Sequence, residues 1–456
     1  MLIRLLPFII ALAFAPSALA GGPTMQFGAA EDVVRTTDLP AAKAKMTLLR
    51  LAGFSSVRVT SQWQGTEATP SETELTVLRN VAGAAQLSAV RVYLSIYPTG
   101  SRVTPLTPEA RELFAAYVTS LKQQLPSIKD VIIGNEPNIN RFWLPQFGPG
   151  GSDVAAQTYT ALLGRSYEAV KLVDPATRVW GGALAPRGID RPGTGRDTHS
   201  PVAFLKDMGI AYRASGRTSP IMDGLADYDR LMRTLATAFD NSPQAGSLLP
   251  VLYDEFGVES KVPAGKASLY TGSEPATTRP VDEITQGAYY AKALQLAFCQ
   301  PNVTGIFVFH TQDEPGLANW QSGLYYADGS PKSSIYAVHD ALGRARGGSI
   351  ARCPGLGLDV AATKVSFPTQ AALASGTRNV RFTCTLDCRW ELRVSAAASG
   401  VTRFKMVGYG RATRAIVVSL KGRKLGTGQV RFSITLTHPL NPGAPQTRES
   451  STLSLH

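Results

Sequence analysis

Glu136 stands where an apolar, strand-like segment ends, and this position makes it a candidate for acid–base chemistry. The segment 131–134 delivers Asn135 and Glu136 together, and Pro137 then ends regular strand pairing because proline has no N–H to donate. A carboxyl group at the end of a strand can give a proton to a bound molecule or take one from it. The alternative is an ordinary loop, in which Asn135 and Glu136 only cap backbone groups.

Glu255 repeats this arrangement after a second apolar segment. Strand alternation predicts Tyr253 and Glu255 on one side and Asp254 on the other, and Gly257 permits a sharp exit from the strand. A general acid and a nucleophile can both be carboxylic acids, so the two glutamates together form a candidate reacting pair. If this segment is only a loop, Asp254 or Glu259 is an equally good candidate carboxylate.

Eight short β-rich segments alternate with amphipathic helical segments, which predicts parallel strands joined by helical crossovers. The predicted strands are 25–28, 56–60, 91–97, 131–135, 178–182, 222–226, 250–254 and 305–309, and the predicted helices include 108–125, 155–173 and 285–298. Eight strands favour a (β/α)8 TIM barrel over an open doubly wound sheet, and no Gly-x-Gly-x-x-Gly turn follows the first predicted strand. The carboxyl ends of the fourth and seventh strands would then bring the two glutamates to one face.

A smaller second domain is predicted to follow the barrel. The predicted limits are 22–346 for the barrel, 347–357 for a linker rich in Gly, and 358–456 for the second domain. Alternating segments such as 380–384, 390–394, 415–420 and 430–436, with few helix signals, predict an all-β sandwich of the immunoglobulin or fibronectin III kind.

The two motifs together resemble glycoside hydrolase clan A, the retaining (β/α)8 glycosidases that include family 5 cellulase-like and family 39-like enzymes. The resemblance rests on Asn-Glu-Pro at 135–137 and Tyr-x-Glu-x-Gly at 253–257, and it covers residues 24–342. It implies hydrolysis of an O-glycosyl bond in a β-linked oligo- or polysaccharide, and it implies no metal and no organic cofactor.

The resemblance also implies a role for each residue of the motifs. Glu136 would be the acid/base and Glu255 the nucleophile of a double displacement, which requires carboxyl groups about 5 Å apart. Asn135 would hydrogen-bond the sugar 2-hydroxyl. Arg58, in the predicted second strand, matches the arginine that keeps the nucleophile ionised, because an opposite charge nearby lowers the pKa of a carboxyl group. Its alternative is a purely structural arginine inside the barrel.

Aromatic side chains near the predicted strand ends are candidate platforms for sugar rings, which stack on flat side chains. The candidates for substrate binding are Tyr253, Trp63, Tyr97, Trp143, His310 and Trp320, with Phe142 and Phe309 beside two of them. Each of these residues is also compatible with packing in the core or in a lid.

The sequence departs from the clan in two places. The predicted sixth strand runs directly into a helix start at 227–230, so its loop is short, and Tyr228 is the only substitute there for the His or Tyr that relatives present. The eighth strand ends in Phe309-His310 where many relatives have Trp, so Trp320 would rebuild that platform. The short loop motivates a second hypothesis, a carbohydrate-binding surface protein that has lost turnover. A third is a barrel enzyme that uses the same glutamates on another substrate.

The N-terminus and the cysteines indicate export. Residues 1–20 combine one cation, a short apolar core and an Ala-x-Ala end, which is typical of a secretory signal peptide and too short for a transmembrane anchor. The four cysteines, Cys299, Cys353, Cys384 and Cys388, are even in number, so we expect Cys384 with Cys388 and Cys299 with Cys353. Two cysteines without clustered histidines make a poor zinc site.

The net charge of +12 is concentrated at the C-terminal end of the chain. Residues 354–456 contain 14 Lys/Arg and 4 Asp/Glu, which gives +10 to that segment. Nucleic acid is not expected as a partner, because the basic surplus lies on a domain that is predicted to be exported. An anionic polymer of the cell envelope is the partner that this charge favours, with the protein secreted or associated with the envelope.

Overall fold

Eight parallel strands form a closed barrel in which each strand pairs with the next and β8 pairs with β1. The computed structural model of the chain describes residues 25–222, 224–225, 230–244, 246, 249–300, 303–347, 362–376, 378–385, 388–410, 413–437 and 447–455. The barrel strands are β1 (Gln26–Ala30), β2 (Ser56–Trp63), β3 (Arg91–Pro98), β4 (Asp130–Ile133), β5 (Arg178–Gly181), β6 (Gly224–Leu225), β7 (Val251–Phe256) and β8 (Val303–Val308). The predicted TIM barrel is therefore confirmed.

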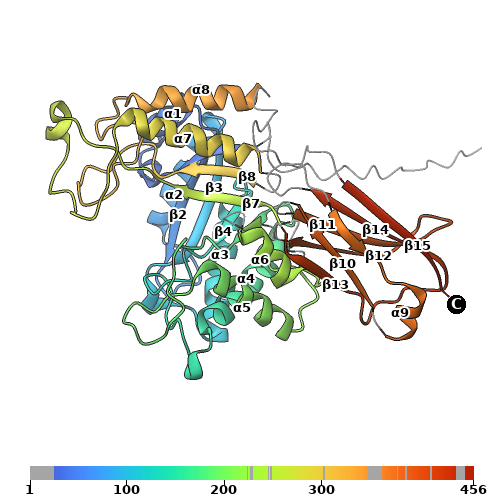
Figure 1. Cartoon of the computed structure of the whole chain (residues 1–456). Helices are drawn as coiled ribbons and strands as arrows, with labels where there is room; N and C mark the ends of the chain where they lie inside the picture. The colour runs from blue at the N-terminus through green and yellow to red at the C-terminus, as the bar shows by residue number, and fades with distance from the viewer. Residues whose placement is uncertain are drawn as a thin grey trace, which may run out of the picture.

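Eight helices lie outside these strands in the described part of the chain (Figure 1). They are α1 (Leu39–Leu51), α2 (Glu72–Leu87), α3 (Pro108–Gln124), α4 (Val154–Val173), α5 (Pro201–Ala214), α6 (Arg230–Phe239), α7 (Glu283–Phe298) and α8 (Ser334–Arg346). Four 3-10 turns lie in the loops, at Asp32–Val34, Ser101–Val103, Pro149–Gly151 and Ala264–Leu269. Helices α1 to α5 and α7 each start after an Asp, Ser or Thr whose side chain accepts a backbone N–H of the first turn, which explains where these helices begin.

The barrel interior has an apolar layer with polar side chains above it. The apolar layer consists of Tyr93, Ile132, Trp180, Ala183, Leu252 and Phe307. Ser95 lies two residues beyond Tyr93 on β3, so it points into the same interior. Arg58 pairs in register with Tyr93, and its guanidinium donates to the Ser95 hydroxyl. A buried cation thus stands above an apolar floor, on the side where the strands end.

The C-terminal part of the chain is an all-β domain of two antiparallel sheets, as predicted. One sheet has the strand order β13-β10-β9 and the other β12-β11-β14-β15. The bounds are β9 (Ala362–Ser366), β10 (Asn379–Cys384), β11 (Cys388–Ala396), β12 (Thr402–Gly410), β13 (Ala415–Ser419), β14 (Gly428–Thr437) and β15 (Thr447–Leu455), with a short helix α9 (Gln370–Ala374). Their inward side chains form one apolar core, in which Phe382 of the first sheet meets Trp390 of the second. Such facing sheets are a sandwich.

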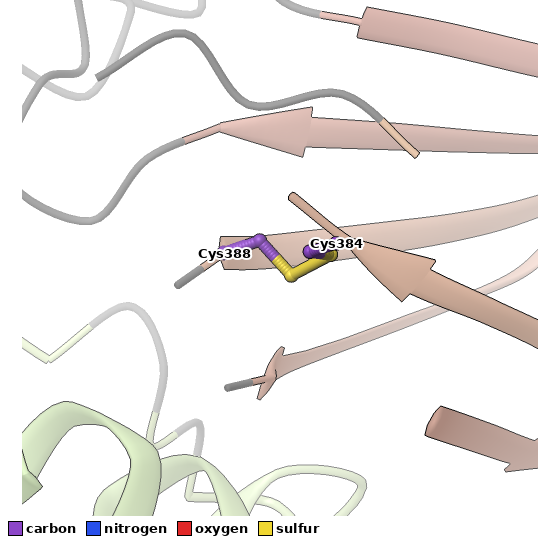
Figure 2. The surroundings of a disulfide bond; sticks show 2 residues. All are labelled: Cys384 and Cys388. Carbon is purple, nitrogen blue, oxygen red and sulfur yellow. A yellow bond between two sulfur atoms is a disulfide. The ribbon is translucent and has the colours of Figure 1, made fainter. Parts of the chain in front are cut away.

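A disulfide between Cys384 and Cys388 joins the end of β10 to the start of β11 (Figure 2), as the sequence predicted. Cys299 is also disulfide-bonded. Its predicted partner, Cys353, lies outside the described residues.

The all-β domain contacts the barrel at α6, and Figure 1 shows β12 and its neighbours beside that helix. Tyr409 of β12 packs against the barrel's apolar core. Around it, a cavity of about 420 Å³ is lined by β12 and by residues of the last turns of α6 and just beyond, among them Ala236, Thr237 and Asp240. The attachment therefore lies at the C-terminal end of α6.

Some predictions fall on residues outside the described ranges. These are the signal peptide at 1–20, most of the linker at 347–357, and Tyr228. The domain limits consequently stay predictions. Of the predicted sixth strand, the described residues include Gly224–Leu225 as β6, and Leu225 pairs with Val251 of β7. In the described part of the chain, no helix combines the length and the apolar character needed to cross a bilayer.

Candidate active site

Glu136 lies just beyond β4 in a backbone conformation that two hydrogen bonds hold in place. Its φ of 41° falls in the left-handed region, which L-residues other than Asn, Asp and Gly rarely adopt. Its N–H donates to the Ala183 carbonyl at 2.7 Å, and its carbonyl accepts from the Ile139 N–H at 3.1 Å. Such a conformation persists only where the surroundings fix it, and here those surroundings include the loop after β5. The side-chain direction of Glu136 is thus set by its neighbours.

Gly134 is required for this turn. Its φ is 88°, and a Cβ at this position would lie 2.7 Å from the ring of Tyr159. The Tyr159 hydroxyl in turn donates to the Ile133 carbonyl and accepts from the Gly182 N–H, so this ring joins the ends of β4 and β5.

Asn138 is a site residue to which sequence reasoning assigned no role. Its side chain is fully buried, and its amide nitrogen donates to the carbonyls of Ala185, Arg187 and His199, while its amide oxygen accepts from the Ala185 N–H. One side chain therefore attaches the turn after Glu136 to the loop after β5. The sequence feature that could have indicated this role is the position of Asn138, an amide side chain directly after the Asn-Glu-Pro motif.

Glu255 and Asp254 both contact Arg58, so the predicted separation of these two acids onto opposite sides is wrong. The pairing of β7 with β8 shifts between Tyr253 and Phe256, where β7 has one more residue than β8. A bulge of this kind interrupts strand alternation and redirects side chains. Asp254 lies 3.7 Å from Arg58 Nε, and Glu255 Oε1 accepts a hydrogen bond from Arg58 Nη1.

Arg58 brings the two predicted motifs together. It is only 4% exposed. Besides its bond to Glu255, its Nη2 donates to Asn135 Oδ1 at 2.9 Å and to Ser95 Oγ at 3.2 Å. Burial by itself would lower the pKa of Arg58, but the charges of Glu255 and then Asp254 outweigh burial and raise it. Arg58 therefore stays charged and orients both Asn135 and Glu255.

The carboxyl group of Glu136 binds a proton more readily than an ordinary glutamate does. Its pKa is raised to about 7, first because the carboxyl is buried and second because the charge of Glu255 repels a second negative charge. Asp254 adds to this effect, and Arg187 and Arg141 oppose it. A protonated carboxyl beside a carboxylate that is paired with arginine can act as a general acid while its neighbour acts as a nucleophile.

Trp63 and Trp143 are core residues, so their predicted role as sugar platforms is wrong. Each is 1% exposed. The Trp63 indole donates to the Glu67 carbonyl and meets the ring of Phe114 edge to face, and Trp143 donates to Thr158 Oγ1. Neither ring has a face open to a ligand.

The other predicted aromatic residues are partly exposed or lie at the rim. The ring of Tyr97 meets Phe142 edge to face at 6.2 Å, and Tyr97 lies close enough to Arg58 to affect its pKa. Trp320 is 47% exposed and meets Phe309 edge to face at 5.5 Å. His310 stacks on Phe309, and its Nδ1 lies 2.6 Å from the Ala30 carbonyl oxygen.

Tyr253 is turned toward helix α7. Its hydroxyl donates to Gln300 Oε1 at 2.8 Å. A cavity of about 350 Å³ has both Tyr253 and Glu255 in its lining. Its lining consists of Leu184, Pro186, Tyr253, Asp254, Glu255, Phe256, Ala293, Leu296, Ala297, Gln300 and Ile306. Glu255 is 35% exposed at its side chain, so a ligand can reach it.

A buried ion pair that sequence reasoning missed joins the loops after β7 and β8. Lys332 donates to Asp313 Oδ1 and to Ser260 Oγ, each at 2.8 Å, and both members of the ion pair have side chains at most 1% exposed. Tyr270 donates its hydroxyl to Asp313 Oδ2 at 2.7 Å. These bonds stabilise the loop that carries Trp320. In the described residues, no group of three or more His, Cys, Asp or Glu side chains could hold a metal ion.

Comparisons with known proteins relate this chain to others by fold. No protein-family profile and no curated sequence matches the chain. Among solved structures, a β-glucuronidase of Bacteroides uniformis matches 96% of this chain and 47% of its own length, with 13% identity and a TM-score of 0.45. This chain thus spans about half the length of that protein.

Two further solved structures match with similar scores. GH5_18 from Streptomyces cattleya in complex with GlcNAc covers 71% of this chain and 81% of its own, at 16% identity and a TM-score of 0.48. The endo-β-1,4-mannanase of Thermotoga petrophila covers 96% and 99%, at 9% identity and a TM-score of 0.46. The chemistry of the site described above must be argued from its own residues.

Proposed function

We propose that this protein is a secreted retaining glycoside hydrolase that cleaves an O-glycosyl bond in a β-linked glycan. The observation that carries the proposal is the pairing of Glu136, with a pKa raised to about 7, with the Arg58-bound carboxylate of Glu255. Glu136 follows β4 and Glu255 is the penultimate residue of β7, so both acids lie at the carboxyl ends of barrel strands, where barrel active sites lie. A buried acid near neutrality and an adjacent carboxylate are the two groups that retention of configuration requires.

The first chemical step uses both acids at once. The Glu255 carboxylate attacks the anomeric carbon and forms a glycosyl ester, while the electrons of the cleaved bond go to the leaving oxygen, which takes the proton of Glu136. In the second step the Glu136 carboxylate removes a proton from water. That water attacks the anomeric carbon and frees Glu255, and Glu136 is protonated again.

Asn135 is placed to bind the sugar beside this bond. Its amide oxygen already accepts from Arg58, so its amide nitrogen is the part of the side chain that can donate to a sugar hydroxyl. Arg58 has a second role in this proposal, because its contact with Glu255 Oε1 fixes one carboxylate oxygen and directs the other.

The pH dependence of kcat/KM follows from the raised pKa of Glu136. This carboxyl keeps its proton below about pH 7 and loses it above, so kcat/KM should fall tenfold per pH unit on the alkaline side of about pH 7. In Glu255→Gln the pKa of Glu136 should drop, because the repelling charge is gone. A pH–rate profile and carbon-13 NMR titration of the glutamates measure both effects. An alkaline limb near 4.5, the ordinary value, would contradict the assignment.

A glycan panel tests the function as a whole. Aryl β-glycosides of the common hexoses, pentoses and uronic acids, together with β-glucans, mannans and xylans, should include at least one substrate that the wild type cuts and that both Glu136→Gln and Glu255→Gln leave intact. The alternative, a carbohydrate-binding protein without turnover, is motivated by the sequence, in which the sixth strand runs directly into a helix start and so leaves a short loop. It predicts ligand binding in the panel without product.

Secretion is part of the proposal. The disulfide between Cys384 and Cys388 supports it, because disulfides persist in oxidising compartments.

We further propose that the sandwich binds an anionic polymer of the cell envelope through the outer face of its four-stranded sheet. Leu392 and Val394 point inward, so Arg393 between them points outward, and it pairs in register with Lys405 of β12. Arg431 on β14 is exposed and lies on the same face, because its register partner on β11 is Ser395, two residues from Arg393. Glu391 accepts from Lys405 at 2.7 Å and from Arg393 at 3.2 Å.

Charge reversal on this face should abolish retention on a polyanion. In the full chain, Arg393→Glu with Lys405→Glu should lose co-sedimentation with cross-linked polygalacturonate, and the wild type should be released by salt. Lys364→Glu, an exposed position on the other sheet, is the matched control and should still sediment. Co-sedimentation with cross-linked dextran, a neutral polymer, measures binding that does not depend on the charge of the polymer. If the double variant is retained as well as the wild type, the proposal that this face binds an anionic polymer is refuted.

A further inference from the structure

Two exposed arginines from different loops lie close enough to Glu136 for their charges to act on its carboxyl group. Arg141 lies in the loop between β4 and α4, and Arg187 lies in the loop between β5 and α5. The loop of Arg187 is attached to the acid at two points. The Glu136 N–H donates to the Ala183 carbonyl at 2.7 Å, and Asn138 Nδ2 lies 3.3 Å from the Arg187 carbonyl oxygen. Arg187 is therefore held beside the acid through its backbone.

Neither guanidinium has an acidic partner within the described parts of the chain. Arg141 lies over the ring of Phe142, at 5.3 Å from its centroid, and Phe142 contacts Tyr97. Arg187 forms no side-chain hydrogen bond or ion pair with the described residues. A guanidinium group that has no acidic partner and lies beside a binding site can form bidentate hydrogen bonds with a carboxylate or another oxyanion.

The acids of the same loop are occupied by other groups. Asp190 Oδ1 accepts from the Ser200 N–H at 2.6 Å, and Asp197 Oδ1 accepts from the Thr194 N–H at 2.9 Å. Both carboxylates thus accept hydrogen bonds from backbone N–H groups that follow β5, rather than pairing with Arg187. The charges of Arg187 and Arg141 still act on the carboxyl of Glu136, whose pKa they lower.

The carboxylates of Glu255 and Asp254, by contrast, both lie beside the buried cation Arg58, at the end of β7. The charges are therefore arranged unevenly: two arginines act on the proposed acid, Glu136, whereas the proposed nucleophile, Glu255, has a second carboxylate near it. In the proposed reaction the acid touches the leaving oxygen, so the positive side receives the leaving group.

We propose that this enzyme prefers a substrate whose leaving group carries an oxyanion, a carboxylate or a sulfate, bound by Arg187 and Arg141. The inference rests on the proposed function, because it uses the assignment of Glu136 as the acid. It names the substrate class as a glycan or glycoconjugate that is acidic on the reducing-end side of the cleaved bond.

Matched coumarin glycosides test this preference. The sugar that wild type accepts best in the panel is attached to 4-methylumbelliferone, to 7-hydroxycoumarin-4-acetic acid and to 7-hydroxycoumarin-4-methanesulfonic acid. These leaving groups differ in charge far from the reacting oxygen. Wild type should show a kcat/KM about tenfold higher for an anionic coumarin than for the neutral one, which is the effect of one charge-assisted hydrogen bond. The two anionic arms distinguish carboxylate from sulfate-like recognition.

The variants Arg187→Gln and Arg141→Gln, singly and together, should bring that ratio toward one. Arg191→Gln is the matched control, since Arg191 is exposed on the same loop as Arg187. A second readout separates a direct role from misfolding. With the neutral substrate, the alkaline limb of the pH–rate profile should move upward in Arg187→Gln, because a charge that lowers the pKa of Glu136 has been removed.

The outcomes separate the two proposals. Turnover of all three glycosides at equal kcat/KM, unchanged by Arg187→Gln, would overturn the anionic preference and leave the glycosidase proposal standing. If no sugar supports turnover, the proposed function fails, and binding of free 7-hydroxycoumarin-4-acetic acid then decides the inference alone. Fluorescence titration should show tighter binding to wild type than to the double arginine variant, and equal binding would overturn it.

Discussion

Replacing Glu255 by Gln should reduce kcat with the best panel substrate by at least about 10⁴-fold, since a covalent route needs its nucleophile. The amide is nearly isosteric and can still accept from Arg58, so the local structure should persist. Azide should restore part of the rate. Because azide would attack the anomeric carbon from the face that Glu255 leaves open, the product should be the glycosyl azide of inverted configuration. Proton NMR of the product identifies that configuration.

Two comparisons make this result specific. Glu259→Gln removes an acid from the same loop that lies on a different cavity, and it should retain most of the wild-type activity. Asp254→Asn removes the other acid next to Arg58. A 2-deoxy-2-fluoro glycoside of the accepted sugar should label the wild type at Glu255, as found by peptide mass spectrometry. A label on Asp254, or activity of Glu255→Gln near that of wild type, would refute the assignment.

Glu136→Gln should show a different pattern, because in the proposed mechanism this residue carries a proton in both steps. With poor leaving groups, kcat/KM should fall about 10²- to 10⁴-fold, and with dinitrophenyl glycosides, which need no protonation, it should change far less. Turnover of those activated substrates should then be limited by release of the glycosyl-enzyme. Azide should accelerate this release and give the glycosyl azide of retained configuration.

The pH profile adds an independent check on the acid. The proposal assigns the expected alkaline limb near pH 7 to Glu136, so this limb should disappear in Glu136→Gln. Asp153 also has a pKa raised to about 7, but it caps helix α4 and lies 3.2 Å from His199, so Asp153→Asn should leave the limb in place. Persistence of the limb in Glu136→Gln, or its loss in Asp153→Asn, would place the titrating group elsewhere.

The strand positions were predictable because apolar β-rich segments and helix-cap residues are local signals. The eight predicted strands correspond to β1 to β8 with ends that differ by a few residues. The proximity of both motifs to Arg58 was also predictable, since parallel strands in a closed barrel bring their carboxyl ends to one face. Within the sandwich, β9, β12 and β15 were not predicted individually, and β12 is the strand that meets the barrel.

The errors arise where a side chain's direction depends on distant parts of the chain. Trp63 and Trp143 stand near strand ends in the sequence, but the rings of Phe114 and Tyr159 on neighbouring helices enclose them. The bulge after Tyr253 appears only when β7 is paired with β8. The ion pair of Lys332 with Asp313 crosses a loop that periodicity cannot describe.

The position of the sandwich has a consequence for how the protein would work on a surface. Helices of the barrel run opposite to the strands, so the contact of β12 with the last turns of α6 lies toward the rim opposite Glu136 and Glu255. If the sandwich binds a surface polymer as proposed, the end of the barrel that carries Glu136 and Glu255 would point away from that polymer. The enzyme would then cleave glycans that reach it from outside, and the polymer that anchors it would be a different material from its substrate.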